Sequence, residues 1–168
     1  MSGETARPWT GGDLRISAAV LAEIEAHAVE CYPSESCGFL VGPAADPALL
    51  DGALRETNEA DRYHALDPET FPRTSKTYFK INELRATRAF EAGDASGRPI
   101  KVIYHSHCDT GDYFSKEDAA TFAAGGQLMW PCAFVVVSVV EGEVMGRRLW
   151  VHVPGTDDFR ESTLTVLA

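Results

Sequence analysis

Continuous apolar runs along the chain predict its buried strands. The clearest run covers residues 133–140, and two others cover 37–41 and 100–104, the last of these interrupted by Lys101. Runs of this length, rich in β-branched residues, are typical of strands that are covered on both faces of a sheet. A turn at Glu141-Gly142 makes the next stretch an antiparallel partner of the first run. Weaker patterns predict this partner strand at 144–153 and further strands at 14–16, 53–57, 78–81 and 163–167.

Amphipathic stretches between these strands predict three helices. Ser17 is a good N-cap for a helix over 18–31, in which apolar residues recur on one face. Two further helices are expected at 83–91, capped by Asn82, and at 116–124, ended by Gly125-Gly126. This order of elements predicts an α/β fold in which a single-domain mixed β-sheet is flanked by helices.

The length of 168 residues is enough for one domain with a substantial core. Residues 1–13 are rich in small and polar types and predict a flexible N-terminal tail, so the domain itself is expected over 14–168. The segment 62–77 carries aromatics, prolines and polar groups without a period, and we interpret it as a long surface connection.

The formal net charge of −10 argues against a nucleic-acid partner, because phosphate contacts need a basic face. The same charge argues against binding to an anionic membrane surface. No apolar stretch follows a basic N-terminal region, so we expect no signal peptide, no membrane span and a cytoplasmic location. The four cysteines lack CxxC spacing and are expected to be reduced thiols: Cys31, Cys37, Cys108 and Cys132.

The strongest chemical signal follows the apolar run 100–104. His105 and His107 alternate at the end of this predicted strand, so their rings leave the backbone on the same side. Ser115 then begins a helix, with Asp118 one turn further in. Two imidazoles and one carboxylate that converge form a three-ligand zinc site with a vacant fourth position, the pattern of a catalytic zinc. The plainer interpretation is a polar strand end followed by a capping-box helix start.

Together, His105, His107, Ser115 and Asp118 resemble the signature of the JAMM metalloprotease family, also called MPN-plus or JAB1/MPN/Mov34. Upstream, the stretch Pro33-x-Glu-x-Cys-Gly-x-Leu-x-Gly42 resembles the first conserved strand region of the bacterial branch of this family. Glu35 stands where the family keeps its catalytic glutamate. The resemblance covers roughly residues 14–152 and implies the cytidine-deaminase-like MPN fold.

The resemblance implies a zinc-dependent peptidase or isopeptidase. Zinc lowers the pKa of a bound water to about 7, and Glu35 would take the proton of that water and return one to the leaving amine. Ser115 would donate its hydroxyl to the oxyanion. The family cuts after the Gly-Gly tail of ubiquitin-like proteins, and short bacterial members are similar to enzymes that process sulfur carriers.

Several other interpretations of the same residues stay open. A zinc deaminase needs His-x-Glu and Pro-Cys-x-x-Cys, and Val135 stands where the second cysteine would be. A cysteine protease could use Cys37 or Cys108. A non-catalytic MPN scaffold, which only binds partners, usually lacks the metal ligands. Cys108 stands where many bacterial relatives have proline, and its thiol could compete with water as a metal ligand. His64 is a lone loop histidine, and such a residue is more often not a metal ligand.

Overall fold

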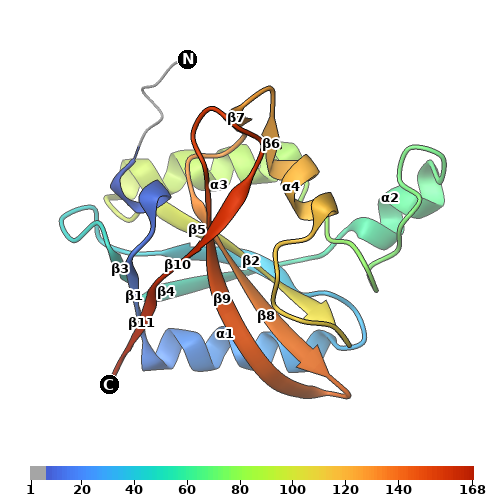
Figure 1. Cartoon of the computed structure of the whole chain (residues 1–168), viewed down its shortest axis with the longest axis horizontal. Helices are drawn as coiled ribbons and strands as arrows, with labels where there is room; N and C mark the ends of the chain where they lie inside the picture. Colours follow the sequence, from blue (N-terminus) through green and yellow to red (C-terminus); the bar gives the residue numbers. More distant parts are fainter. Residues whose placement is uncertain (1–6) are drawn as a thin grey trace.

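A six-stranded mixed sheet forms the centre of the computed structural model, which describes residues 7–168 (Figure 1). Its only parallel neighbours are the two central strands, β5 and β8, and every other pair is antiparallel. The predicted mixed sheet with flanking helices is therefore confirmed. The strands run in the order β10 (Phe159–Ser162), β9 (Glu143–His152), β8 (Ala133–Val140), β5 (Ile100–Cys108), β2 (Cys37–Val41) and β4 (Gly52–Glu56).

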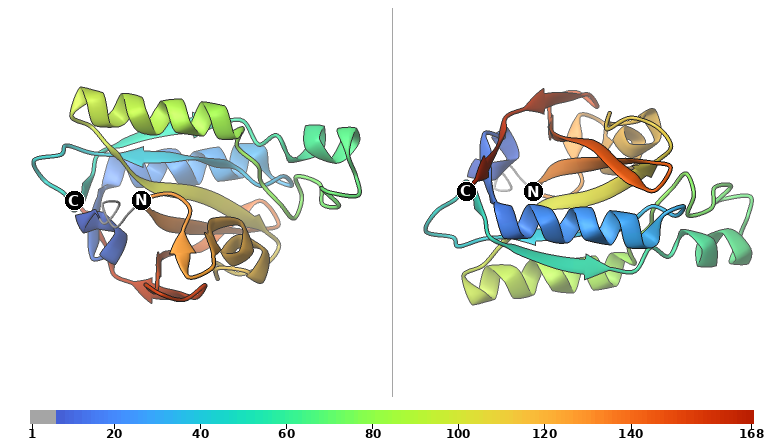
Figure 2. Two further views of the ribbon diagram at one scale, coloured as in Figure 1. Left: turned by 90° about the horizontal axis from the view of Figure 1, so that it is seen from above. Right: turned by 90° about the horizontal axis from the view of Figure 1, so that it is seen from below.

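Helices cover both faces of this sheet. Helix α1 (Ala18–Cys31) lies below the sheet in Figure 1, whereas α3 (Glu83–Ser96) and α4 (Lys116–Phe122) lie above it, and Figure 2 shows α1 and α3 from opposite sides. Neighbouring residues of β5 belong to different cores: Val102 packs with α1 and Ile103 with α3 and α4. The apolar runs of the central strands are explained by the burial of both faces, although β5 also contains the buried Lys101 and two histidines.

A second, three-stranded sheet lies beside the first and joins distant parts of the chain. Strand β1 (Leu14–Ser17) pairs in parallel with β11 (Leu164–Leu167) on one side and with β3 (Leu49–Leu50) on the other. A small hairpin of β6 (Ala123–Ala124) and β7 (Gln127–Leu128) follows α4. The short strands β3, β6, β7 and β10 were not predicted, because two- to four-residue strands carry too few alternating positions.

The expected flexible tail needs correction where the structure describes it. Residues 1–6 lie outside the described residues, but Pro8–Gly11 form a 3-10 helix. Trp9 is only 5% exposed, and its Nε1 donates a hydrogen bond to the carbonyl oxygen of Pro131 at 2.9 Å. A large ring that packs in the core and has its one donor satisfied fixes this segment.

The segment 62–77 is also more structured than predicted. Helix α2 (Ala60–Leu66) begins it and projects from the body of the molecule (Figure 1). The remainder, from Asp67 to Asn82, is an irregular strap that returns to the sheet and that we call the 67–82 strap. The second predicted helix continues to Ser96 because Gly97, in the left-handed conformation, provides its C-cap.

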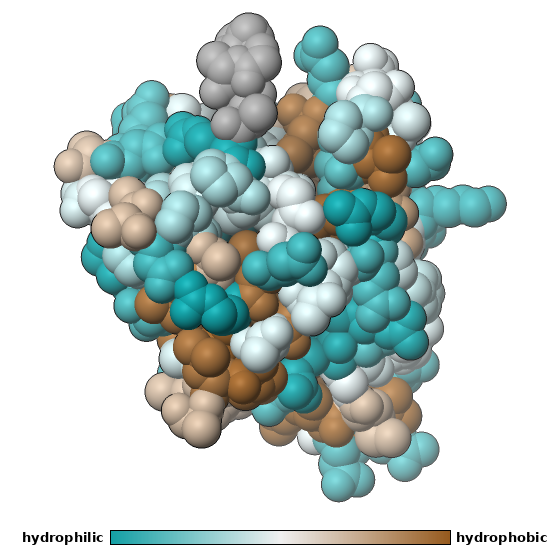
Figure 3. Space-filling view, turned by 60° about the vertical axis from the view of Figure 1, so that its left-hand side comes forward, coloured by the Kyte–Doolittle hydropathy of each residue, from teal (hydrophilic) through white to brown (hydrophobic). Residues whose placement is uncertain are grey.

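The surface is dominated by hydrophilic side chains with smaller hydrophobic areas between them, as one face shows in Figure 3. Among residues 7–168, none of the helices combines the length and the apolar character that a bilayer crossing requires.

Lys101 is an unusual charged residue in the core. Its side chain is fully buried, and Nζ donates hydrogen bonds of 2.8–2.9 Å to the carbonyl oxygens of Pro43, Asp46 and Leu49. The same ammonium lies 5.6 Å from the centre of the Trp9 ring. Lys101 therefore supplies the donors that the turn between β2 and β3 needs, and it joins this turn to the N-terminal 3-10 helix.

Lys101→Met is expected to lower the free energy of unfolding by roughly 2–4 kcal/mol, because three carbonyl groups lose their donor. Urea unfolding followed by circular dichroism measures this change. The matched control is Lys116→Met, which removes an exposed lysine and should change stability by less than about 0.5 kcal/mol. Equal stabilities for the two variants would contradict the role of Lys101.

Candidate metal centre

The end of β5 presents two histidines on one face of the sheet. His105 is fully buried and His107 is 4% exposed, and their Nε2 atoms lie 3.2 Å apart. Asp118, in the first turn of α4, brings Oδ2 to 3.1 Å from Nε2 of His105 and 3.2 Å from Nε2 of His107. The structure thus brings together the three side chains that the sequence predicts as metal ligands.

Asp118 is held by a capping box at the start of α4. The Oγ atom of Ser115 accepts a hydrogen bond from the backbone N–H of Asp118 at 3.0 Å, and Asp118 Oδ2 accepts one from the N–H of Ser115 at 3.1 Å. The capping box at the start of α4 and the candidate metal site therefore share Asp118, and the two interpretations of this motif describe one arrangement. Since Ser115 Oγ only accepts in this box, its own proton remains available for donation.

Neighbouring groups orient the two imidazoles. His107 Nδ1 lies 2.8 Å from the carbonyl oxygen of Gly111, which can only accept, so Nδ1 carries a proton and Nε2 is the nitrogen through which this ring could bind a metal. The ring of Phe79 stacks on that of His105, with 4.3 Å between centroids and 23° between planes. A histidine fixed through its second nitrogen is the usual arrangement of a metal ligand.

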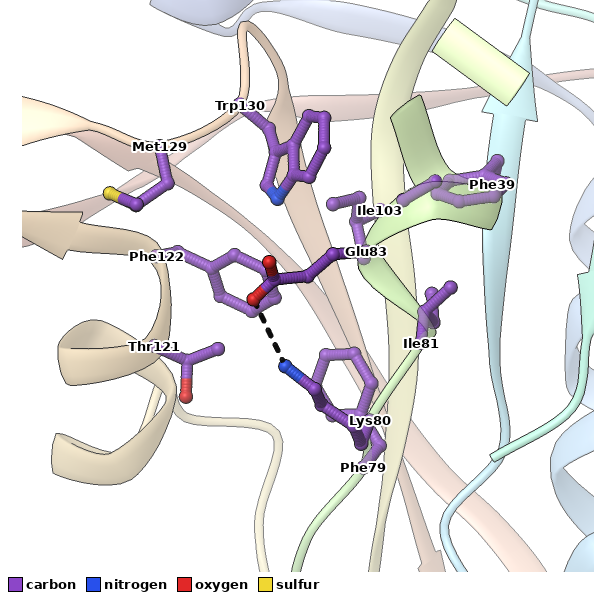
Figure 4. Close-up of a pocket in the computed structure, with 11 residues that line it drawn as sticks. Phe39, Phe79, Lys80, Ile81, Glu83, Ile103, Thr121, Phe122, Met129 and Trp130 are labelled. Atoms are coloured by element: carbon purple, nitrogen blue, oxygen red, sulfur yellow. Dashed lines mark hydrogen bonds and ion pairs between the residues drawn. The ribbon is translucent and has the colours of Figure 1, made fainter. Parts of the chain in front are cut away.

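Phe79 also lines an apolar pocket of about 160 Å³ between α3 and α4 (Figure 4). Phe122 and Trp130 form other parts of its wall, and an ion pair of 3.5 Å between Lys80 and Glu83 lies across it. His105 therefore packs against the rings of Phe79 and Phe114. Such an apolar surrounding strengthens electrostatic interactions at the histidine.

The three ligand atoms fit a small cation. They form a triangle with sides of 3.1–3.2 Å, and tetrahedral zinc with bonds of about 2.0–2.1 Å places neighbouring ligands roughly 3.3–3.4 Å apart. Burial alone would raise the pKa of Asp118, but the charges and hydrogen bonds of His105 and His107 outweigh it and hold that pKa far below its usual range. Two imidazole nitrogens and a carboxylate oxygen at these distances are held together by protons on the rings or by a cation in their place.

Glu35 lies just before β2 and is 5% exposed. It lines a polar hollow of about 130 Å³ together with His107, Ser115 and Asp118. Burial, reinforced by the charge of Asp118 and opposed by that of Arg73, raises the pKa of Glu35 to about 9. The carboxyl predicted to move protons thus shares one hollow with the candidate ligands.

Asn58 joins the Glu35 segment to the 67–82 strap. Its Nδ2 donates hydrogen bonds to the carbonyl oxygens of Glu35 at 2.9 Å and Tyr78 at 3.0 Å, and its Oδ1 accepts from the N–H groups of Ala60 and Lys80. The side-chain amide of Asn58 thus donates two hydrogen bonds and accepts two. The sequence marks Asn58 only as the end of a strand, so its role could not be predicted.

The strap also contacts Glu35 directly. The N–H of Glu35 donates to the carbonyl oxygen of Ser75 at 2.7 Å, and the hydroxyls of Ser34 and Ser75 lie 2.9 Å apart. Arg73 and Lys76, on either side of Ser75, line the hollow. Sequence reasoning missed both cations because the strap has no periodic pattern that would place them.

Other candidate residues are not part of the ligand cluster, although Cys108 lines the same hollow as Glu35. His64 Nδ1 lies 2.8 Å from the carbonyl oxygen of Phe71, and neither it nor Cys108 belongs to the ligand cluster found among the described residues. Burial raises the pKa of Cys37 far above its usual range, and burial with the charges of Glu35 and Asp109 raises that of Cys108 to about 12. Thiols held in this protonated form are poor nucleophiles.

Comparison with known proteins gives one family. A model described as prokaryotic homologues of the JAB domain matches residues 17–153. The CysO-cysteine peptidase of Mycobacterium tuberculosis (strain ATCC 25618 / H37Rv) is 33% identical over 108 residues, and the match spans 62% of this chain and 62% of that relative's length.

Solved structures share the fold. A protein from Desulfitobacterium hafniense superposes with a TM-score of 0.67 at 17% identity, over 92% of each chain. A JAB1/MPN domain protein from Archaeoglobus fulgidus gives a TM-score of 0.54 at 16% identity, over 94% of this chain and 100% of that one.

Asn58→Asp is expected to loosen the Glu35 segment, because two carbonyl oxygens lose their donor while the accepting bonds of the side chain remain. Exchange of the Glu35 amide hydrogen, followed by NMR, should become about 10- to 100-fold faster. Asn82→Asp is the matched control: it makes the same change at the N-cap of α3, where Asp caps as well as Asn. Unchanged protection in Asn58→Asp would contradict the proposed link.

Proposed function

The chain belongs to the prokaryotic JAB family, and on this premise we propose that it is a zinc-dependent peptidase that acts on a sulfur-carrier protein. The family agrees with the JAMM/MPN membership that the two sequence motifs predicted. The observation that carries the proposal is the meeting of Glu35, Ser115 and two of the three candidate ligands at one polar hollow. The name of the Mycobacterium tuberculosis relative supplies the substrate class.

In this proposal His105, His107 and Asp118 hold the zinc ion. Two imidazole nitrogens and one carboxylate oxygen form a donor set of the catalytic type, which leaves one coordination position for substrate or solvent. When bound, zinc supplies Lewis acidity that polarises the scissile carbonyl and lowers the pKa of water. The capping box positions Asp118 and the Gly111 carbonyl orients His107, whereas Nδ1 of His105 is buried without a hydrogen-bond partner among the described residues.

Glu35 moves the protons. As a carboxylate it takes a proton from the water that attacks the scissile carbonyl, and as a carboxylic acid it delivers a proton to the leaving amine. Its burial favours the protonated form, which makes it a ready donor for the second step. Ser115 donates its hydroxyl hydrogen to the oxygen of the carbonyl as negative charge develops there.

The substrate we propose is a ubiquitin-fold sulfur carrier that ends in Gly-Gly. The hollow is small, at about 130 Å³, and is lined by residues of both the strap and the β5–α4 connection. A chain that passes between these two walls has little room for side chains, and glycine permits the close backbone approach. The JAMM resemblance supports the same tail sequence.

The alternative function is a binding scaffold without activity. The complete ligand set favours a metalloenzyme over this alternative, because a scaffold has no need for a buried pair of histidines around a carboxylate. A cysteine protease is disfavoured by the raised pKa values of Cys37 and Cys108.

Wild-type protein is expected to bind one zinc ion per chain, and Asp118→Ala should bind it at least about 100-fold more weakly because one of three ligands is lost. Mass spectrometry of the native protein and competition with a zinc indicator measure this. Glu117→Gln removes the neighbouring carboxylate, which lies outside the cluster, and should bind zinc as wild type does. A wild type without stoichiometric zinc supports the scaffold instead.

Glu35→Gln is expected to keep its zinc but to lower kcat by about 100- to 10,000-fold, because the amide cannot accept or deliver the proton. The assay is release of a residue placed after the Gly-Gly tail of a sulfur carrier, followed by mass spectrometry. Glu30→Gln, an exposed change of the same charge at the end of α1, should retain wild-type kcat. A fully active Glu35→Gln would remove Glu35 from the mechanism.

A further inference from the structure

Two positive charges stand at the hollow that holds the proposed catalytic groups. Arg73 and Lys76 line it, and both come from the 67–82 strap. Its remaining charged residues are the carboxyl groups of Glu35, Glu117 and Asp118. In a chain of net charge −10, Arg73 and Lys76 give this hollow, beside its carboxyl groups, two side chains that can pair with an anion.

Neither cation is committed to a strong internal partner. Arg73 Nη2 pairs with Glu117 Oε2 at 3.2 Å, but both side chains are more than 40% exposed, and exposed ion pairs of this kind are weak. Lys76 has no ion pair with any residue that the structure describes and is exposed. A carboxylate ligand could therefore take the place of Glu117 at the guanidinium at little cost.

The position of the cations relative to Glu35 is fixed through the backbone. Ser75, which lies between them in the sequence, accepts the N–H of Glu35 at 2.7 Å. Its own N–H and hydroxyl donate to the carboxylate of Asp61, each at 2.8 Å. The charge of Arg73 reaches far enough to act on Glu35. The strap thus presents its cations beside the group that protonates the leaving amine.

We propose that Arg73 and Lys76 bind the free α-carboxylate of a single amino acid that is released from the carrier tail. This inference rests on the proposed function. In a terminal residue the α-carboxylate is attached to the same carbon as the leaving nitrogen, so the cations that bind it must lie next to Glu35. A lysine side chain joined through its ε-amine offers no carboxylate there. The two cations therefore favour removal of a single C-terminal residue from the carrier over release of the carrier from a lysine side chain.

The reaction remains a simple hydrolysis. The amide bond between the last glycine and the terminal residue breaks, and the oxygen of water becomes part of the new glycine carboxylate. One proton of that water passes through Glu35 to the leaving nitrogen. The departing amino acid keeps its own carboxylate, which Arg73 and Lys76 hold until release.

The test compares two carriers that differ only at the terminal residue. One ends in Gly-Gly-Cys with a free carboxylate, and the other ends in the same sequence with a C-terminal amide. Wild type should cut the acid with a kcat/KM about 10- to 100-fold higher than the amide, since charge-assisted hydrogen bonds contribute this much. In Arg73→Gln and in Lys76→Gln, this acid-to-amide ratio should fall toward one.

Arg62→Gln is the matched control, because it removes a cation of α2 that does not line the hollow, and it should keep the wild-type ratio. Calorimetry of the same two carriers with Glu35→Gln, which should not cut them, measures the preference for the acid over the amide in binding alone. Equal cleavage of acid and amide by wild type overturns the inference and leaves the proposed function intact. A ratio that survives in both Arg73→Gln and Lys76→Gln also overturns it. Failure to cut either carrier refutes the proposed function itself.

Discussion

The carboxylate of Asp118 is the point on which this structure depends. Its Oδ2 atom closes the capping box of α4 and at the same time faces both imidazoles at the end of β5. Helix α4 is only seven residues long, so it has little stability of its own, and its start is fixed by this contact with the sheet. The β5–α4 connection therefore obtains its geometry from the same three side chains that can hold the cation. With the proposed metal bound, folding and metal binding would be linked through one oxygen atom.

The other half of the site is built by a different kind of structure. Glu35 is not carried by a regular element but is held by hydrogen bonds to Ser75 and Asn58. Those contacts connect it to the strap, which in turn is fastened by Asp61 at the start of α2. A rigid strand and helix start thus supply the candidate ligands, whereas a network of polar contacts positions the carboxyl that we propose moves protons. The network can serve only because nearly every donor and acceptor in it is used.

The sequence predicted the strands and helices whose side chains follow a regular period. The apolar runs of β2, β5 and β8, and the capped helices α1 and α3, follow from side-chain period and from the chemistry of Ser17 and Asn82. The side-by-side imidazoles follow from the two-residue period of β5. The strap could not be predicted, because its conformation depends on Asn58 and Ser75 meeting partners far away in sequence. Trp9 was missed for a similar reason, since nothing local shows that residue 131 supplies its acceptor.

The strap has a consequence for how selectivity and catalysis are related. Because Ser75 accepts the N–H of Glu35 and lies between Arg73 and Lys76, a shift of the strap would move the cations together with the carboxyl that we propose transfers protons. An anionic leaving residue, once bound, would contact the strap through the substrate. Asn58 holds the strap through contacts within the protein. A substrate without that anion would leave the strap held from one side only. Discrimination would then affect kcat as well as KM, since binding energy from the carboxylate contributes to the position of Glu35 in the transition state.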